Sequence, residues 1–409
     1  MFSILAWQPL ACLFCSLAAL HPKSRIRKPC SRFKPTEQID KIPLTRAEEG
    51  YVQAGNAFAW KLFQKVWDGN TSKESFIISP LSVQYALGML GNGADQEVSA
   101  KVAQVLGYSG TDAINAYCSK MIQCLPMVDT TVTLALADGV VVNDKFTLKA
   151  PFRSAMEDSY DALVEPMSFE DPDKVLKWIN DWCEQHTFGR IKNALDYVYP
   201  LAVVYLLNAI YFNGAWQASF DPADTRSENF KTFSGASRKV KMMHQDLGER
   251  YYAESDLCQM ISLGYGRGMY QMNIYLPKKA SDLPRLIADP GKNLQFERAH
   301  VILSLPSFET AFRTDLLAIL YDMGLPVSPY TEMAETSLEI SRIIHKANIT
   351  VNEKRTEAAA VTIVELRFTS NLSQPEPRTV NFTADHPFLY TITEASTGAI
   401  HFAGVYTGK

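Results

Sequence analysis

The stretch of sequence that decides the fold is NEKRTEAAAVTIVELRFTS, residues 352–370. It begins with polar residues typical of a turn and continues with the alternation of a strand. Every second residue over 356–368 is small or apolar, whereas the opposite face carries charges such as Glu357 and Glu365. The residues that follow, NLSQPEPRT (371–379), have the composition of an exposed loop. A segment leading into a loop therefore carries the pattern of a buried strand.

The composition of the whole chain is that of a globular protein. It has 409 residues, of which 47% are hydrophobic and 21% charged, enough to bury a large core. From residue 46 to the C-terminus we find no Gly/Ser-rich linker, repeat or low-complexity block, so we expect a single domain over 46–409. A net charge of −4 gives no general attraction to nucleic acid or to anionic membranes, so neither is expected as a partner of the mature domain.

The N-terminus differs from the rest of the chain. Residues 2–20 form an apolar run with a small-x-small site at Ser16-Leu17-Ala18, which predicts a signal peptide over 1–18 and a secreted or extracytoplasmic protein. A membrane anchor and a lipoprotein are the alternatives, and Pro9 argues against both. Residues 19–45 are rich in Pro, Lys and Arg, and we predict that they are disordered.

The cysteines do not suggest a disulfide framework or a metal site. Beyond the predicted leader their number is odd, their spacing is scattered, and no two of them form a CxxC pair. They are Cys30, Cys118, Cys124, Cys183 and Cys258. We therefore predict no bound metal and a fold that its hydrophobic core stabilises.

Helical signals come first along the chain, and strand signals dominate its second half. Helices are expected over 44–67, where a Thr precedes the apolar periodicity, in the second part of 76–94 after a Ser-Pro entry, and over 314–325 with a stop at Gly324. Strands are expected over 131–142, 203–212, 270–277 and 301–308, and a hairpin over 386–406. The order predicts an α+β fold with large antiparallel or mixed sheets.

Catalytic motifs are missing from the sequence. It contains no G-x-S-x-G, no H-E-x-x-H, no P-loop and no G-x-G-x-x-G. His345 lies on an expected strand whose odd-numbered positions are apolar, so a hydrogen-bonded core histidine is a better interpretation than a catalytic base. We predict that the protein is not an enzyme and uses no cofactor.

Four segments resemble one known family, the serpins, in the order and at the distances that this family shows. They are FIISPLSVQYALGMLGNGA (76–94), LLNAIYFNGAW (206–216), SRIIHKANITVNEKRTEAAAVT (341–362) and HPFLYTITEASTGAIHFAGVY (386–406). The resemblance covers roughly residues 46–407. It implies a serpin fold with three β-sheets, about eight or nine helices, and an exposed reactive-centre loop at about residues 353–380.

The resemblance also implies a mechanism that explains the unusual loop pattern. In serpins a protease cuts the exposed loop, which then inserts as a new strand of the central sheet and traps the acyl-enzyme. By this resemblance the chain would be an irreversible suicide-substrate inhibitor of serine proteases, with cysteine proteases as further candidate targets. It would be a monomer that forms a covalent complex with its target. The alternative is a non-inhibitory serpin that acts as a carrier, chaperone or adhesion module.

The same resemblance assigns roles to individual residues of the loop. The hinge that enters the sheet first would comprise Glu353, Thr356, Glu357, Ala358, Ala359, Ala360 and Thr362. Counting from Glu353 places the reactive bond at Thr369–Ser370. Counting from the C-terminal side moves it, so Arg367, Phe368 and Leu372 are alternatives. One departure is Arg355, which stands where inhibitory serpins usually have Gly, and we expect it to slow insertion at most.

Two further groups are carried over from the family. The hydrogen-bonded cluster called the shutter, which holds the central strands closed, would consist of Ser79, Ser82, Asn208 and His345. Trp216 matches the tryptophan of the breach, where insertion begins. Simple core packing is the alternative for all five. Because an unpaired polar group in an apolar strand is unfavourable, we expect Asn208 and His345 to bond to each other or to the two serines.

Overall fold

Most of the helices in the described part of the chain lie before residue 187, as the sequence predicts. The computed structural model describes residues 38–326, 328–338, 340, 342–353 and 377–408. These residues contain eight α-helices: α1 (Arg46–Gly69), α2 (Pro80–Asn92), α3 (Gln96–Leu106), α4 (Thr111–Val128), α5 (Ala150–Ser159), α6 (Pro172–His186), α7 (Leu283–Ala288) and α8 (Leu317–Asp322). Short 3-10 helices cover Pro222–Asp224 and Ala280–Asp282.

The ends of α1 and α8 show how local sequence sets the helix boundaries. Thr45 caps α1 with a capping box, because its side chain accepts from the Glu48 N–H and the Glu48 carboxylate accepts from the Thr45 N–H over 2.7 Å. Helix α8 ends just before Gly324, whose φ of 102° favours glycine and stops the helix. Both ends agree with the prediction.

The strands form three sheets in the described part of the chain. They are β1 (Phe76–Ile78), β2 (Thr133–Asn143), β3 (Leu163–Met167), β4 (Val204–Asn213), β5 (Arg226–Lys231), β6 (Ser237–Glu254), β7 (Cys258–Tyr265), β8 (Tyr270–Pro277), β9 (Gln295–Pro306), β10 (Phe308–Asp315), β11 (Ile344–Val351), β12 (Thr379–Thr383), β13 (Phe388–Glu394) and β14 (Ile400–Tyr406). Nine strands share one sheet in the order β1-β14-β13-β8-β7-β6-β9-β12, with β5 paired to β6. The expected hairpin is β13–β14, and the α+β class with mixed sheets is confirmed.

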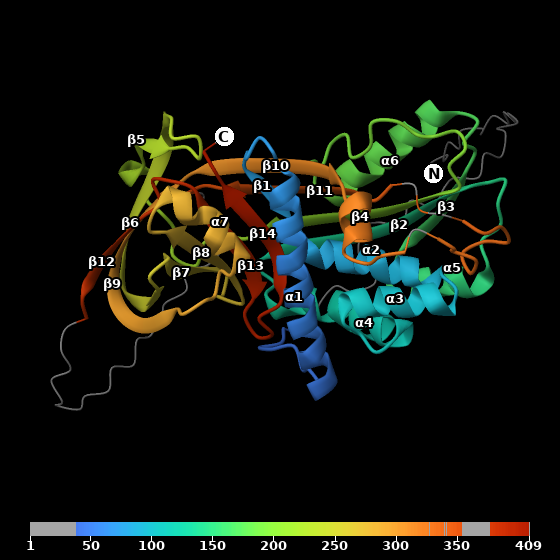
Figure 1. Cartoon of the computed structure of the whole chain (residues 1–409), viewed down its shortest axis with the longest axis horizontal. Helices are drawn as coiled ribbons and strands as arrows, with labels where there is room; N and C mark the ends of the chain where they lie inside the picture. Colours follow the sequence, from blue (N-terminus) through green and yellow to red (C-terminus); the bar gives the residue numbers. More distant parts are fainter. Residues whose placement is uncertain (1–37, 327, 339, 341, 354–376, 409) are drawn as a thin grey trace, which may run out of the picture. The chain divides into compact units, whose positions relative to one another are not determined.

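The two smaller sheets position the site. One has the order β3-β2-β4 and the other consists of β10 and β11. Strands β4 and β11 lie side by side, with β2 beyond β4 and β10 beyond β11 (Figure 1). Of the backbone pairings that the described residues make, none joins β4 to β11. The sheet that carries the site is therefore present as two parts with a gap between them.

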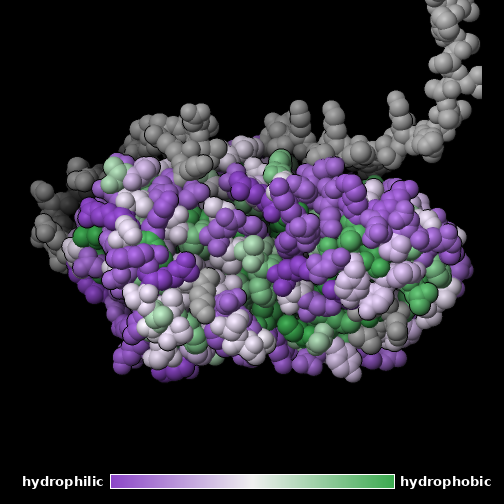
Figure 2. Space-filling model, turned by 90° about the horizontal axis from the view of Figure 1, so that it is seen from above, coloured by the Kyte–Doolittle hydropathy of each residue, from purple (hydrophilic) through white to green (hydrophobic). Residues whose placement is uncertain are grey.

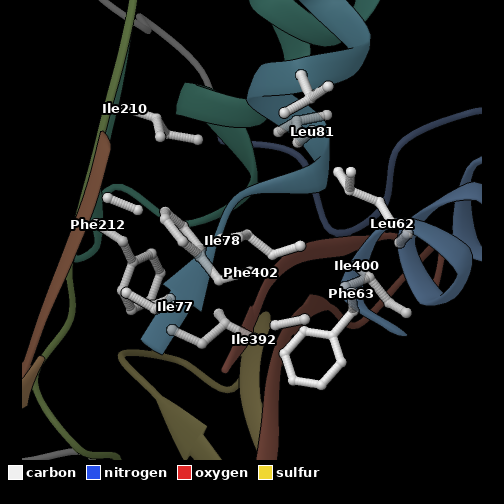
Figure 3. Packing of buried hydrophobic residues seen from close by; sticks show 14 of the residues in the cluster. Leu62, Phe63, Ile77, Ile78, Leu81, Ile210, Phe212, Ile392, Ile400 and Phe402 are labelled. Atoms are coloured by element: carbon white, nitrogen blue, oxygen red, sulfur yellow. The ribbon is translucent and has the colours of Figure 1, made fainter. Parts of the chain in front are cut away.

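Both faces of the β3-β2-β4 sheet are covered by helices. Val141 and Ala209 pack on one face against Ile179 and Trp182 of α6. Side chains of the opposite parity, such as Ile210, point into the main core, on the side of α2. Figure 3 shows that side of the sheet, with Ile210 and Phe212 near Ile77, Ile78 and Phe402. An odd-numbered residue of β4 thus meets α6, and an even-numbered one meets the main core.

The described residues from Gln38 onward belong to one compact unit. Hydrophilic side chains cover most of the face shown in Figure 2, and hydrophobic ones lie between them in smaller groups. Cys118, Cys124, Cys183 and Cys258 are free thiols. Among the helices of the described residues, none has the length and hydropathy needed to cross a bilayer. The predicted signal peptide and Cys30 lie outside the described residues.

Candidate functional site

The gap between β4 and β11 is the candidate site. We call the end at which both strands begin the lower end, and the end at which they finish the upper end. A cavity of about 380 Å³ at the upper end is lined by Tyr211 and Asn213 of β4 and by Thr350 of β11. A cavity of about 320 Å³ at the lower end is lined by residues that include Val204 and Ile344. Two strand edges facing each other without ladder hydrogen bonds are a place where a further strand can be added.

The shutter residues meet where α2 begins, next to this gap. Ser79 is the N-cap of α2, and its backbone N–H donates to Nε2 of His345 on β11 over 3.1 Å. The Ser79 hydroxyl donates to the main-chain carbonyl of His401 on β14 over 2.8 Å. Ser79 and His345 are both buried. One residue at the helix entry thus joins β11 to the core strand β14.

A second chain of bonds links α2 to β4. The Ser82 N–H donates to the Ser79 hydroxyl oxygen over 3.2 Å. The Ser82 hydroxyl in turn donates to Oδ1 of Asn208 on β4. Together with the Ser79–His345 bond, these contacts bring together Ser79, Ser82, Asn208 and His345, which we call the shutter cluster. The cluster ties β4 and β11, the two strands that flank the gap, to the same turn of α2.

The buried position of His345 determines its protonation. Burial lowers the pKa of His345 to about 4, because a charged imidazolium would lose its hydration inside the core. Since the Ser79 N–H donates to Nε2, that nitrogen carries no proton and the ring is neutral. His401 resembles it, because burial lowers its pKa to about 3. Neither histidine carries charge near neutral pH.

Asp138 is a member of this site that sequence reasoning missed. It lies on β2 directly opposite Asn208, whose side-chain amide donates to Asp138 Oδ1 over 2.5 Å. Burial raises the pKa of Asp138 to about 7, although the bond from Asn208 opposes the shift. The signal was present, since Asp138 is the single charged residue in the apolar run TVTLALADGVVV (131–142). The shutter cluster therefore extends to the next strand of the sheet.

Trp216 stands at the upper end of the gap. Its indole N–H donates to the main-chain carbonyl of Asn352, just after β11, over 2.9 Å. Its ring stacks on Tyr265 with 4.3 Å between the centroids. It also lines the upper cavity. Trp216 thereby holds the last residues before the loop to the nine-stranded sheet.

The start of the hinge is anchored nearby. The Thr225 hydroxyl donates to the Glu353 carboxylate over 2.7 Å. The other predicted hinge residues, Thr356, Glu357, Ala358, Ala359, Ala360 and Thr362, lie outside the described residues, as does Arg355. The same holds for the predicted reactive bond Thr369–Ser370 and its alternatives Arg367, Phe368 and Leu372.

The serine and histidine of the shutter cluster are not arranged as a nucleophile and base. His345 accepts from the Ser79 backbone N–H, whereas the Ser79 hydroxyl donates to a carbonyl oxygen. A catalytic pair requires the hydroxyl itself to donate to the imidazole. Over the described ranges, no group of three or more His, Cys, Asp or Glu side chains is placed to hold a metal ion. The geometry of the cluster suits a structural contact between strands.

Comparison with known protein families and sequences gives a consistent result. The family described as "Serpin (serine protease inhibitor)" matches residues 53–408. Serpin-Z10 of Arabidopsis thaliana is 31% identical over 357 residues, which cover 81% of this chain and 90% of that protein. Serine protease inhibitor 42Dd of Drosophila melanogaster is 29% identical over 362 residues, covering 84% and 94%.

Solved structures agree with the sequence comparisons. The structure of Arabidopsis AtSerpin1 in its native stressed conformation superimposes with a TM-score of 0.78 at 26% identity. It covers 89% of this chain and 99% of that chain. The similarity thus extends over most of the chain.

Proposed function

The chain belongs to the serpin family, and from this premise we propose that it is an irreversible inhibitor of serine proteases, and in some cases of cysteine proteases. Since serpins are protease inhibitors, the chain is not an enzyme. The proposed target attacks the reactive-centre loop as it would attack a substrate. The cleaved loop then enters the gap between β4 and β11 as a new strand.

The observation that carries this proposal is the open gap beside a segment with a strand pattern. Strands β4 and β11 present facing edges, and Glu353 at the end of the β11 segment leads directly into the loop. A tight turn near residue 354 would bring Val364 opposite Ile344 in an antiparallel pairing. Residues 366–368 would then reach the lower cavity. The apolar second half of the alternating face matches the apolar end of the gap.

The energy for trapping comes from completing the sheet. Insertion of about a dozen residues forms on the order of ten ladder hydrogen bonds at roughly 1 kcal/mol net each. Burial of apolar side chains adds to this release. The sum is comparable with the unfolding free energy of a whole domain. A release of this size can move a covalently attached protease and distort its catalytic residues.

Trapping depends on the chemistry of the target. A serine protease forms an acyl-enzyme with the carbonyl of the cut bond, and water then hydrolyses this ester with the help of the protease's own histidine. The inhibitor supplies no catalytic residue. It needs only to insert its loop faster than the ester is hydrolysed, so the rate of insertion decides between inhibition and simple cleavage.

One feature favours the second candidate, a non-inhibitory serpin. Arg355 stands at the hinge position where a Gly would adopt a positive φ without strain. A non-Gly residue there costs roughly 1 kcal/mol, which would slow the turn that starts insertion. The small residues at 356, 358 and 360 favour the inhibitor, because bulky side chains would hinder the entry of the loop between β4 and β11.

We also propose where the inhibitor acts and in which oligomeric state. The predicted signal peptide at 1–18 supports a secreted or extracytoplasmic protein, and we propose that it acts as a monomer on proteases that it meets there. The covalent complex with the target would contain one copy of each protein.

A protease panel tests the proposed function. The full chain is incubated with trypsin-like, chymotrypsin-like, elastase-like, subtilisin-like and papain-like enzymes and analysed on denaturing gels. We expect a complex that survives denaturation with at least one of them. Mass spectrometry of the released C-terminal fragment identifies the reactive bond, which we expect at Thr369–Ser370. Cleavage within 365–373 without any stable complex would favour the non-inhibitory candidate.

A further inference from the structure

Two exposed aromatic side chains lie close together on the outer face of β6 and β9. Tyr251 on β6 is 75% exposed, and Phe296 on β9 is 67% exposed. The register pairs Tyr251 with Arg298, and Phe296 lies two residues before Arg298 on the same face of β9. Single exposed hydrophobic residues are ordinary, but neighbouring ones on one face of a sheet indicate an interaction surface.

Arg298 extends this surface and gives it a charged edge. Its guanidinium carbon lies 6.0 Å from the centroid of the Tyr251 ring, and the guanidinium pairs with Glu249 over 3.3 Å. Ala253 and Ala299 on the same two strands are fully buried, so the surface stands on the core. We call Tyr251, Phe296 and Arg298 the aromatic patch. Aromatic residues and arginine beside charged residues are typical of the centre of a protein–protein interface.

The chain that leaves the reactive-centre loop joins the sheet beside the aromatic patch. Strand β12 runs parallel to β9, with Thr379 opposite His300 (Figure 1). Just before β12, the Arg378 carbonyl accepts from the His300 N–H over 3.0 Å. The Arg378 guanidinium donates to Glu254 of β6 over 2.7 Å and to Glu297 of β9 over 2.8 Å. The chain after the loop is therefore fixed to the two strands that carry the aromatic patch.

A protease that holds the predicted reactive bond is large enough to contact this face. Arg378 is eight residues after Ser370, and these residues span at most about 29 Å when fully extended. A compact protease domain of about 200 residues has a radius of gyration of about 17 Å. The size of the protease is thus comparable with the longest possible distance from the bond to Arg378.

We propose that the aromatic patch binds the surface of the target protease and adds to the contact that the protease makes with the loop. This occupant rests on the proposed function, because it is the enzyme that attacks the loop. The matching protease surface carries an apolar side chain next to a carboxylate. Tyr251 and Phe296 cover the apolar group, and Arg298 donates to the carboxylate. The contact selects among proteases that cut the same bond and speeds formation of the first complex.

Trapping rates of variants of the full chain test this contact. Tyr251→Ser and Phe296→Ser are made singly and together, and are incubated with the panel protease that the parent traps fastest. The double variant should trap it at least about tenfold more slowly. The number of inhibitor molecules consumed per trapped protease should stay the same, because neither the loop nor the gap has changed. Tyr321→Ser on α8, where the side chain is 60% exposed, is the matched control and should trap as the parent does.

The first complex is measured directly with the same protease after its nucleophile has been replaced by alanine. This enzyme binds the loop without cutting it. Its affinity for the double variant should be at least about tenfold lower than for the parent, and its affinity for Tyr321→Ser should equal that for the parent. If the double variant does not fold by circular dichroism, the two single variants decide.

Three outcomes overturn the proposal. One is an equal trapping rate and affinity in the parent and the double variant, and another is the same loss in Tyr321→Ser. A third is a concentration-dependent dimer of the parent that the double variant does not form, which would assign the aromatic patch to a second copy of this chain.

Failure of the proposed function gives a different result. If proteases cut the loop but none is trapped, the inhibitor hypothesis fails, and the aromatic patch is judged by the rate of cutting. The double variant should then lower kcat/KM for cleavage of the folded chain, mainly through KM, and an unchanged kcat/KM would overturn the aromatic patch as well. If no protease of the panel cuts the loop, both proposals fail.

Discussion

Asn208 and Asp138 face each other across β4 and β2, and the Asn208 amide donates to the Asp138 carboxylate over 2.5 Å. Asn208 also accepts from Ser82, so its amide lies between a buried acid and the entry of α2. Asn208 therefore connects the strand at the edge of the gap to two neighbours at once. A change in either partner alters how firmly β4 is held.

Replacement of Asp138 by Asn should change the pH dependence of stability. The pKa of Asp138 is raised to about 7 in the folded protein, above its ordinary value of 3.8, so the folded state binds this proton more tightly. Its contribution to the unfolding free energy is fully present below pH 3.8 and is lost as the pH rises through 7. Relative to the parent, Asp138→Asn should gain about 2–3 kcal/mol between pH 5 and pH 8. Denaturant titrations at both pH values measure this, with the exposed Asp256→Asn as control.

The buried His345 changes the unfolding free energy with pH in the opposite direction to Asp138. Because its folded pKa of about 4 lies below the ordinary 6.5, its stabilising contribution is present above pH 6.5 and is lost as the pH falls through 4. In the parent, Asp138 partly offsets this loss. Asp138→Asn should therefore lose stability more steeply than the parent between pH 6 and pH 4. If the unfolding free energies of the two proteins change in parallel over this pH range, the proposed contribution of Asp138 is wrong.

Loss of the His345 ring should loosen the closed gap. His345→Ala leaves the buried Ser79 N–H without its acceptor, at a cost of roughly 1–3 kcal/mol. We predict that on mild heating this variant forms latent monomers or loop-sheet polymers while it keeps its fold at low temperature. Native gels and size-exclusion chromatography of heated samples measure this. The matched control is His300→Ala, since His300 lies on β9, away from the gap, and pairs with Asp246.

Substitutions in the predicted hinge should convert an inhibitor into a substrate. Ala358→Arg adds a bulky charge, and Ala360→Pro removes an N–H that a new strand would use. Both should be cleaved at the parent's rate but form few covalent complexes with the same protease. Ala223→Arg, at an exposed position outside the loop, should inhibit as the parent does. Undiminished complex formation by either hinge variant would refute insertion as the trapping step.

Cleavage of the loop should stabilise the protein strongly. A cut within 365–372 frees the loop to complete the divided sheet, which should raise the unfolding midpoint by roughly 10–30 °C. Calorimetry before and after limited proteolysis measures the shift. An unchanged midpoint after complete cleavage would support the non-inhibitory candidate.

Trp216→Phe separates the two contacts of this residue. Phenylalanine keeps a ring against Tyr265 but cannot donate to the Asn352 carbonyl. We expect a loss of about 0.5–1.5 kcal/mol in the unfolding free energy and faster conversion to the latent state. Trp60→Phe, on α1 far along the chain from the breach, is the control. Equal conversion rates in the two variants would show that the indole bond does not hold the upper end.

The sequence alone determined several local elements of the fold. Strand alternation and capping residues are local properties, so the Thr45 cap, the stop at Gly324 and the β13–β14 hairpin could be read from short stretches. The choice of the four shutter residues came from family resemblance together with the rule that buried polar groups find partners. That rule states that a partner exists and does not say which one.

Only the tertiary structure decided which distant residues meet. Asp138 contacts the shutter cluster because the pairing of β2 with β4 places it opposite Asn208, which is 70 residues away in the sequence. His345 and Ser79 are 266 residues apart and meet because β11 packs beside the first turn of α2. Periodicity fixes which face a side chain occupies, but register and packing between separate segments fix its neighbours. Those neighbours set the pKa of Asp138 and the open gap on which the proposed function depends.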